Sequence, residues 1–203
     1  MSSNISVSIT GGNHKGDRVA NDFYASTPEC VYSLMAVEGA HLAAHKVLEP
    51  CCGTGAISSI LIRDYGLEVY SSDLIDRGYG VTGQDFLTMW ETDCTAVVTN
   101  PPFNLAEKFI QHSLGFLKVE YLALLLKSQY WHSKKRTALF ERYPPAVVYP
   151  MTWRPDFLNK GSPTMDCQWT VWRAGDTDTR YRPMHKHTSP LAAPSTGAAP
   201  PAP

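Results

Sequence analysis

Short apolar runs and segments of helical periodicity alternate along the first two thirds of the chain. The apolar runs predict buried parallel strands, because strands covered on both faces read as continuous hydrophobic segments. These runs occupy 46–48, 67–72, 96–99 and 121–126. Apolar residues recur at helical spacing in 27–37, which opens on the helix-start signal Thr27-Pro28, and in 56–62 and 105–117. The alternation predicts an α/β domain with a mostly parallel sheet.

The last third of the chain has a different pattern. A basic helix is predicted at 133–143, and apolar segments at 147–149 and 168–172 predict the last strands, with an antiparallel partner. The segment 156–166 between them is rich in Gly, Ser, Pro and Asn, which predicts a surface loop near the substrate. We therefore expect a flexible N-terminal segment (1–20), one domain (21–174) and a disordered tail rich in Pro and Ala (175–203).

A glycine-rich turn separates the first predicted strand from the helix that follows it. Gly53 and Gly55 allow the backbone to bend tightly and to approach a ligand without a Cβ in the way. This strand, turn and helix open a nucleotide-binding α/β unit, although Ser58 replaces the third glycine of a dinucleotide fingerprint. Glu49, just before the glycines, disfavours a pyrophosphate and suits the ammonium group of an amino-acid moiety.

Two further acids stand at the ends of predicted strands. Asp73 lies 20 residues after Gly53, the spacing at which an acid usually accepts hydrogen bonds from ribose hydroxyls. The pair Asp85-Phe86 follows another strand and is suited to bind an adenine amino group and to cover the adenine ring. These acids predict a nucleoside site along one edge of the sheet.

The tetrad Asn100-Pro101-Pro102-Phe103 directly follows the apolar run 96–99. Ligands of open α/β sheets bind at the carboxyl ends of such strands. The Asn100 amide oxygen and a prolyl carbonyl can accept both N–H bonds of an exocyclic amine, since prolines carry no competing amide hydrogen. The prolines stiffen the loop, and Phe103 offers a face on which a base can stack. The tetrad predicts a receptor for a planar substrate with an amino group.

In this order and combination the motifs resemble those of class I S-adenosylmethionine-dependent methyltransferases, and particularly those of phage-encoded Dam-like DNA N6-adenine methyltransferases. The resemblance covers residues 20–173 and includes the segment 22–28, which is similar to an F-Y-x-T-P element with one additional residue. With Cys51 added as a residue packed near the cofactor, the expected cofactor-binding residues are Phe23, Tyr24, Thr27, Glu49, Pro50, Cys51, Gly53, Gly55, Asp73, Asp85 and Phe86. The expected catalytic residues are Asn100, Pro101, Pro102 and Phe103.

The resemblance implies a Rossmann-like class I fold, with a doubly wound, mostly parallel seven-stranded sheet and an antiparallel strand near the C-terminus. It implies S-adenosylmethionine as cofactor and methyl transfer to the N6 amine of adenine in DNA, in the cytoplasm of a bacterial host, by a phage- or prophage-encoded enzyme. No large target-recognition region follows the predicted sheet, which favours relaxed or short-site specificity.

Charge is distributed unevenly although the net charge is only −1. Residues 1–100 contain 5 Lys and Arg against 12 Asp and Glu, a balance of −7, and residues 101–203 contain 13 against 7, a balance of +6. A polyanion would therefore approach the second half more favourably. The residues expected to bind nucleic acid are Lys127, Lys134, Lys135, Arg136, Arg154 and Lys160.

The composition argues against several other classes of site. Five cysteines without a C-x-x-C pair, and histidines without ligand spacing, favour neither a disulfide framework nor a metal centre. The sequence has no apolar run of 18 residues and no secretory signal, so we expect no membrane partner and a reducing cytoplasm. Oligomeric state is not indicated.

Three alternatives remain open. RNA adenine or guanine N-methyltransferases, and enzymes that methylate protein glutamine, use the same kind of tetrad. The basic second half disfavours a protein substrate but does not separate DNA from RNA. An idle cofactor-binding protein is the third alternative, and the complete tetrad argues against it.

Overall fold

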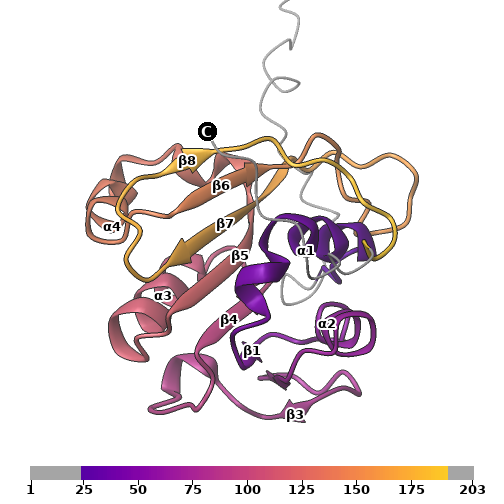
Figure 1. The fold of residues 1–203 in the computed structure, drawn as a ribbon, viewed down its shortest axis with the longest axis horizontal. Helices are drawn as coiled ribbons and strands as arrows, with labels where there is room; N and C mark the ends of the chain where they lie inside the picture. Colours follow the sequence, from indigo (N-terminus) through magenta and orange to yellow (C-terminus); the bar gives the residue numbers. More distant parts are fainter. Residues whose placement is uncertain (1–23, 192–203) are drawn as a thin grey trace, which may run out of the picture.

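The computed structural model describes residues 24–191. Their centre is one eight-stranded sheet with the order β3-β2-β1-β4-β5-β7-β6-β8 (Figure 1). Neighbouring strands pair in parallel except β7, which is antiparallel to both β5 and β6. The strands are β1 (Val47–Glu49), β2 (Val69–Asp73), β3 (Val81–Thr82), β4 (Ala96–Thr99), β5 (Tyr121–Lys127), β6 (Val147–Pro150), β7 (Cys167–Arg173) and β8 (Arg180–Tyr181). The predicted mostly parallel sheet with one antiparallel strand is confirmed, with one strand more than expected.

Helices cover both faces of this sheet, with α1 and α2 on one side and α3 and α4 on the other (Figure 1). The helices are α1 (Pro28–Leu42), α2 (Ser58–Tyr65), α3 (Ala106–Ile110), which continues as the π-helix η3 (Gln111–Phe116), α4 (Thr137–Arg142), and the 3-10 helices η2 (Phe86–Thr88), η4 (Ser128–Trp131) and η5 (Lys134–Arg136). The first helix begins at Pro28 as predicted and runs to Leu42, beyond the expected end near Val37.

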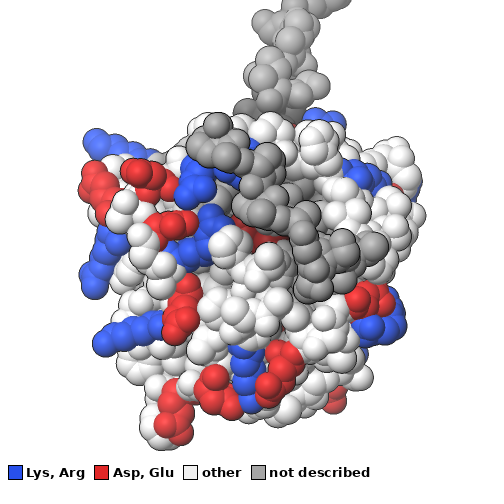
Figure 2. Space-filling view, viewed as in Figure 1, with Lys and Arg blue, Asp and Glu red and all other residues white. Residues whose placement is uncertain are grey.

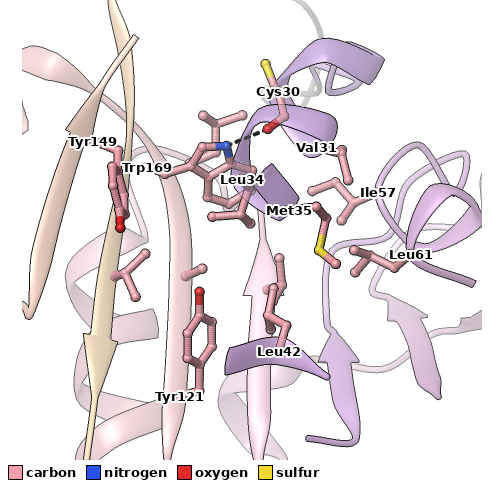
Figure 3. Packing of buried hydrophobic residues seen from close by; sticks show 14 of the residues in the cluster. Cys30, Val31, Leu34, Met35, Leu42, Ile57, Leu61, Tyr121, Tyr149 and Trp169 are labelled. Atoms are coloured by element: carbon pink, nitrogen blue, oxygen red, sulfur yellow. Dashed lines mark hydrogen bonds between the residues drawn. The ribbon is translucent and has the colours of Figure 1, made fainter. Parts of the chain in front are cut away.

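The alternation of side chains along β5 builds the two cores. Tyr121, Ala123 and Leu125 face α1 and α2, whereas Leu122, Leu124 and Leu126 face α3 and α4. Because both faces are buried, the strand reads as one apolar run. In the first core the fully buried Trp169 donates its indole N–H to the carbonyl of Cys30, 2.9 Å away, which joins β7 to α1 (Figure 3).

The C-terminal strap, which we define as residues 175–191, is ordered, so the prediction of disorder from residue 175 is wrong. It contributes β8, which pairs with β6, and then runs toward α1 (Figure 1). Met184 is fully buried and forms a bridge with Met151, and the His187 backbone N–H donates to Ser33 Oγ at 2.9 Å. The strap is ordered although its composition is polar, because Met184 is buried in the core and β8 pairs with the edge of the sheet through backbone groups. The remainder of the predicted tail (192–203) and the predicted flexible segment (1–20) lie outside the described residues.

Candidate functional site

The acids and the tetrad predicted from the sequence meet at one edge of the sheet. Glu49, Asp73 and Asn100 stand at or directly after the carboxyl ends of β1, β2 and β4, and all three line one cavity of about 500 Å³. Strands β1 and β4 are neighbours although β2 and β3 intervene in the sequence, so the sheet order reverses here. The cavity therefore lies at the topological switch point, where open α/β sheets bind ligands.

Glu49 is a buried carboxyl group that lines this cavity. Its Oε2 accepts hydrogen bonds from the backbone N–H and the hydroxyl of Ser58, at the start of α2. Its Oε1 has no hydrogen-bond partner among residues 24–191. Burial raises the pKa of Glu49 from 4.5 to about 8 against the hydrogen bonds from Ser58, and the neighbouring Asp73 raises it further. A cation beside Oε1 would favour the ionised form.

Asp73 organises the glycine-rich turn. Its Oδ2 accepts from Gly53 N–H at 2.8 Å, and its Oδ1 accepts from Ile75 N–H at 2.8 Å and from the Arg77 guanidinium at 3.3 Å. Gly53 and Gly55 have φ of 56° and 83°, a region that side chains other than glycine rarely adopt. From the sequence, the 20-residue spacing between Gly53 and Asp73 predicted a contact with ribose hydroxyls. The structure shows that Asp73 also accepts a hydrogen bond from Gly53 and so holds the turn, a role that the sequence did not indicate.

Asp85 and Phe86 stand at the start of the short helix η2. Asp85 caps the helix by accepting from Leu87 N–H at 2.9 Å, and it is exposed at the cavity. Phe86 is buried against Phe109, with ring centroids 4.7 Å apart, and also lines the cavity. One acceptor and one fixed ring face are thus available to an aromatic ligand.

Asn100 is held by the segment that precedes α1. Its Nδ2 donates to the carbonyl oxygen of Tyr24 at 2.8 Å, a contact across 76 residues of sequence. This bond fixes the orientation of the amide and leaves Oδ1 as the acceptor that Asn100 can offer at the cavity. Tyr24 is buried, and its own ring contacts Phe103 and Phe157, with centroids 6.2 and 6.1 Å away.

The rest of the tetrad divides between the cavity and its border. Pro102 lines the cavity, Pro101 is buried, and Phe103 is half-buried outside the cavity lining, beside Tyr24. The ammonium of Lys127, the last residue of β5, lies over the Phe103 ring at 4.6 Å from its centroid. Phe103 is therefore placed next to the cavity that Asn100 lines, with a charged group on its ring.

Most of the expected cofactor-binding residues surround the cavity. Those that line it are Tyr24, Glu49, Pro50, Cys51, Asp73, Asp85 and Phe86. Burial raises the pKa of the Cys51 thiol, which keeps it neutral there. Gly53 and Gly55 shape the turn without lining the cavity, Thr27 stands at the N-cap position of α1 outside it, and Phe23 lies outside the described residues.

Sequence reasoning missed several cavity residues. Arg77 lines the cavity although it belongs to none of the proposed motifs, Ser26 lies in the segment 22–28 but was not among the expected cofactor-binding residues, and Asn104 follows the tetrad directly. Phe157, in the loop between β6 and β7, reaches the site through Tyr24. Ser26 and Asn104 carried a usable signal, which was their position within the segment 22–28 and next to the tetrad. The others come from loops whose approach depends on the fold.

The expected nucleic-acid-binding residues have different surroundings. Lys134 and Lys135 are exposed on η5, after the carboxyl end of β5. Arg136 lies on the Tyr130 ring and donates to the Tyr130 carbonyl, Arg154 pairs with Asp166 at 2.7 Å, and Lys160 is exposed in the β6–β7 loop. On the face that Figure 2 shows, Lys and Arg are interspersed with Asp and Glu.

No protein-family model matches the chain, and no curated protein has detectable sequence similarity to it. Solved structures do match. The methyltransferase subunit of a type I restriction-modification system from Streptococcus thermophilus aligns with a TM-score of 0.58 and 13% identity over 79% of this chain and 47% of that subunit. An m1A22 tRNA methyltransferase from B. subtilis aligns with a TM-score of 0.50 and 12% identity over 71% of this chain and 66% of that protein. The chain has the fold of a class I methyltransferase.

The match concerns architecture. This chain spans about half the length of the restriction-modification subunit, and a candidate hemolysin from Lactococcus lactis matches as well, with a TM-score of 0.50 and 9% identity over 77% of this chain and 93% of that protein. Identities this low show the fold alone, so what the chain does must be argued from its site.

The class I fold implies S-adenosylmethionine, and the cavity residues fit this molecule. Oε1 of the buried Glu49, which has no hydrogen-bond partner within the described part of the chain, fits the α-ammonium. Asp73 accepts three hydrogen bonds and retains one lone-pair site for a ribose hydroxyl. Asp85 and Phe86 fit the adenine amino group and ring. Within residues 24–191, no cluster of His, Cys, Asp and Glu is arranged for a metal ion, and no helix has the length and hydrophobicity to cross a membrane.

Proposed function

We propose that this chain transfers a methyl group from S-adenosylmethionine to the exocyclic N6 amine of adenine in DNA. One observation carries the proposal: the Asn100 amide lines the cavity with its nitrogen bonded to Tyr24, so that its oxygen is the group presented to a substrate. A neutral amide oxygen can accept a hydrogen bond from the amine without removing its proton. It therefore suits an amine whose nitrogen must keep its lone pair available for attack.

The chemistry requires alignment more than acid or base groups. Bound S-adenosylmethionine would supply a sulfonium methyl group. The amine nitrogen would attack the methyl carbon in line as the C–S bond breaks, and S-adenosylhomocysteine would leave as a neutral thioether. The N6 lone pair of adenine is delocalised into the ring. Acceptance of its two N–H bonds by Asn100 Oδ1 and a prolyl carbonyl of the tetrad would favour a tetrahedral nitrogen and stabilise the positive charge that develops there. The proton then leaves the methylated nitrogen for solvent.

Features beside the tetrad favour a nucleic acid as the carrier of this amine. Phe103 offers a ring for stacking, and Lys127 adds a positive charge beside it. A duplex adenine would have to be extruded from the helix to reach them. We choose DNA over RNA because of the phage Dam-like resemblance, and with it we propose relaxed or short-site specificity and the cytoplasm of a bacterial host.

The direct test is transfer of labelled methyl from S-adenosylmethionine to unmethylated DNA and to RNA, followed by nucleoside analysis. Wild-type protein should produce N6-methyladenine in DNA. Asn100→Ala should reduce the rate by about a hundredfold or more, as expected when one preorganised group at the reacting centre is removed. Gln111→Ala, which removes an exposed amide on η3, should have wild-type activity.

The outcomes separate the alternatives. Label in RNA alone would keep the chemistry and replace the substrate. A failure to label either nucleic acid, with cofactor binding intact, would contradict the proposal and favour a protein substrate or an idle fold. Full activity of Asn100→Ala would contradict the role of the tetrad.

A further inference from the structure

The aromatic ring expected to stack on the target base already has a charged group on its face. Lys127 Nζ lies 4.6 Å from the Phe103 ring centroid, and both residues are half-buried. The pairing of β4 with β5 explains this placement. Thr99 is level with Leu124 in the parallel register, so the tetrad that follows β4 runs beside the last residues of β5, where Lys127 lies.

Lys127 differs from the other partly buried basic residues in what surrounds it. Lys46 pairs with Asp93 and Glu68 at 2.6 and 2.9 Å, and Arg173 pairs with Glu38 and Asp176. Lys127 forms no ion pair or hydrogen bond with residues 24–191, and the Phe103 ring is its partner. A half-buried ammonium without a counter-ion retains three N–H groups that can donate hydrogen bonds to phosphate oxygens.

We propose that Lys127 covers Phe103 until nucleic acid binds, and that its ammonium then moves to a phosphate next to the extruded adenine while the base takes its place on the ring. This inference rests on the proposed function and specifies how the same site selects its substrate. The exchange is favourable on both sides. Stacking of the base on the ring replaces the cation–π contact that is lost, and the ammonium gains a charge-assisted hydrogen bond.

Lys127 is then a positioning residue that couples occupancy of the base site to the DNA backbone. Free adenine or adenosine would have to displace the ammonium without offering a diester phosphate in return. The device therefore favours an adenine within a nucleic acid strand over the isolated base.

The test pairs a protein variant with a modified substrate. After an oligonucleotide with a methylated adenine has been mapped with wild-type enzyme, KM is measured for that oligonucleotide and for versions with a neutral methylphosphonate at each phosphate flanking the adenine. Lys127→Gln should raise KM about tenfold on the natural oligonucleotide, the loss expected for one charge-assisted hydrogen bond. On one of the methylphosphonate versions the variant and the wild type should have the same KM.

The matched control is Lys118→Gln, an exposed lysine just before the opposite end of β5, which should behave as wild type on every oligonucleotide. Cofactor affinity and thermal unfolding of Lys127→Gln should equal those of the wild type. If wild-type enzyme methylates DNA but the effect of Lys127→Gln persists on all methylphosphonate versions, or the variant has no effect, this inference is wrong and the proposed function stands. If wild-type enzyme methylates no DNA, the proposed function is itself overturned.

Discussion

A buried carboxyl group beside a ligand cavity must change its protonation when a cation binds next to it. The pKa of Glu49 is about 8 in the free protein, so most molecules hold a proton on Glu49 at pH 6, whereas the α-ammonium of S-adenosylmethionine favours the carboxylate. We therefore expect binding of S-adenosylmethionine at this cavity to release a proton. We expect the affinity for S-adenosylmethionine to rise by roughly tenfold per pH unit between pH 5.5 and 7.5. Calorimetry in buffers of different ionisation enthalpy measures both the affinity and the released proton.

Two controls isolate Glu49 as the source of this pH dependence. 5′-Methylthioadenosine lacks the amino-acid moiety, and its affinity should not change with pH in this range. Glu49→Gln should bind S-adenosylmethionine more weakly and without the pH dependence. Because the folded pKa is raised, the contribution of Glu49 to stability is complete below pH 4.5 and is lost as pH rises to about 8. Glu49→Gln should therefore gain stability relative to wild type at pH 8.5. Equal pH profiles for both proteins would contradict this assignment.

At the scale of elements, the connection between β2 and β3 offers a test of how tightly the cavity wall is built. Gly78 and Gly80 both lie in this connection with positive φ, 82° and 72°. A Cβ at Gly78 would meet no atom within 4 Å, whereas a Cβ at Gly80 would lie 2.6 Å from the Ser71 carbonyl oxygen and 2.8 Å from Cys52 Sγ.

Gly78→Ala should therefore lower the free energy of unfolding by about 1 kcal/mol, the cost of a left-handed conformation for alanine. Gly80→Ala adds a clash with backbone and should cost about 3 kcal/mol or more. It should also weaken S-adenosylmethionine binding, since Cys52 lines the cavity. Urea unfolding of both variants measures the difference. Equal losses of unfolding free energy in the two variants would contradict this expectation and show that the backbone at Gly80 shifts to accommodate the added methyl group.

The elements most accurately predicted from sequence are the central strands. Runs such as 96–99 and 121–126 are apolar on both faces, and only a strand buried between two helical layers requires this. β8 was missed because its two residues are exposed and pair through backbone groups, which leave no side-chain pattern. Because the apolar runs locate the strands, they also locate the strand ends. The polar residues that follow these ends could therefore be assigned to a ligand-binding edge of the sheet.

At the scale of the whole molecule, the contacts that complete the site join segments far apart in the sequence. Tyr24 reaches Asn100 across 76 residues, and Phe157 reaches Tyr24 from the β6–β7 loop. Local patterns do not contain such pairings, because they depend on how the layers assemble. The sequence thus predicted which residues would meet at the strand ends but not the contacts that orient them.

The C-terminal strap ties β6 to the helix that follows Tyr24. Its Met184 is fully buried with backbone bonds to Pro150 and Thr152, and Lys186 pairs with Glu29 at 3.6 Å in the first turn of α1. Met184→Ala should lower the free energy of unfolding by about 2–5 kcal/mol, because the removed side chain leaves a cavity.

Leu191→Ala, at a half-exposed position of the same strap, should change the stability by no more than about 0.5 kcal/mol. Urea unfolding measures both variants. If Met184→Ala were as stable as Leu191→Ala, the strap would not contribute to the core. Because the strap contacts the first turn of α1, Met184→Ala should also weaken S-adenosylmethionine binding in the folded protein, where the adjacent Tyr24 and Ser26 line the cavity. A loss of stability with unchanged cofactor affinity would separate the strap from the site and leave the position of Tyr24 to its contacts with Asn100, Phe103 and Phe157.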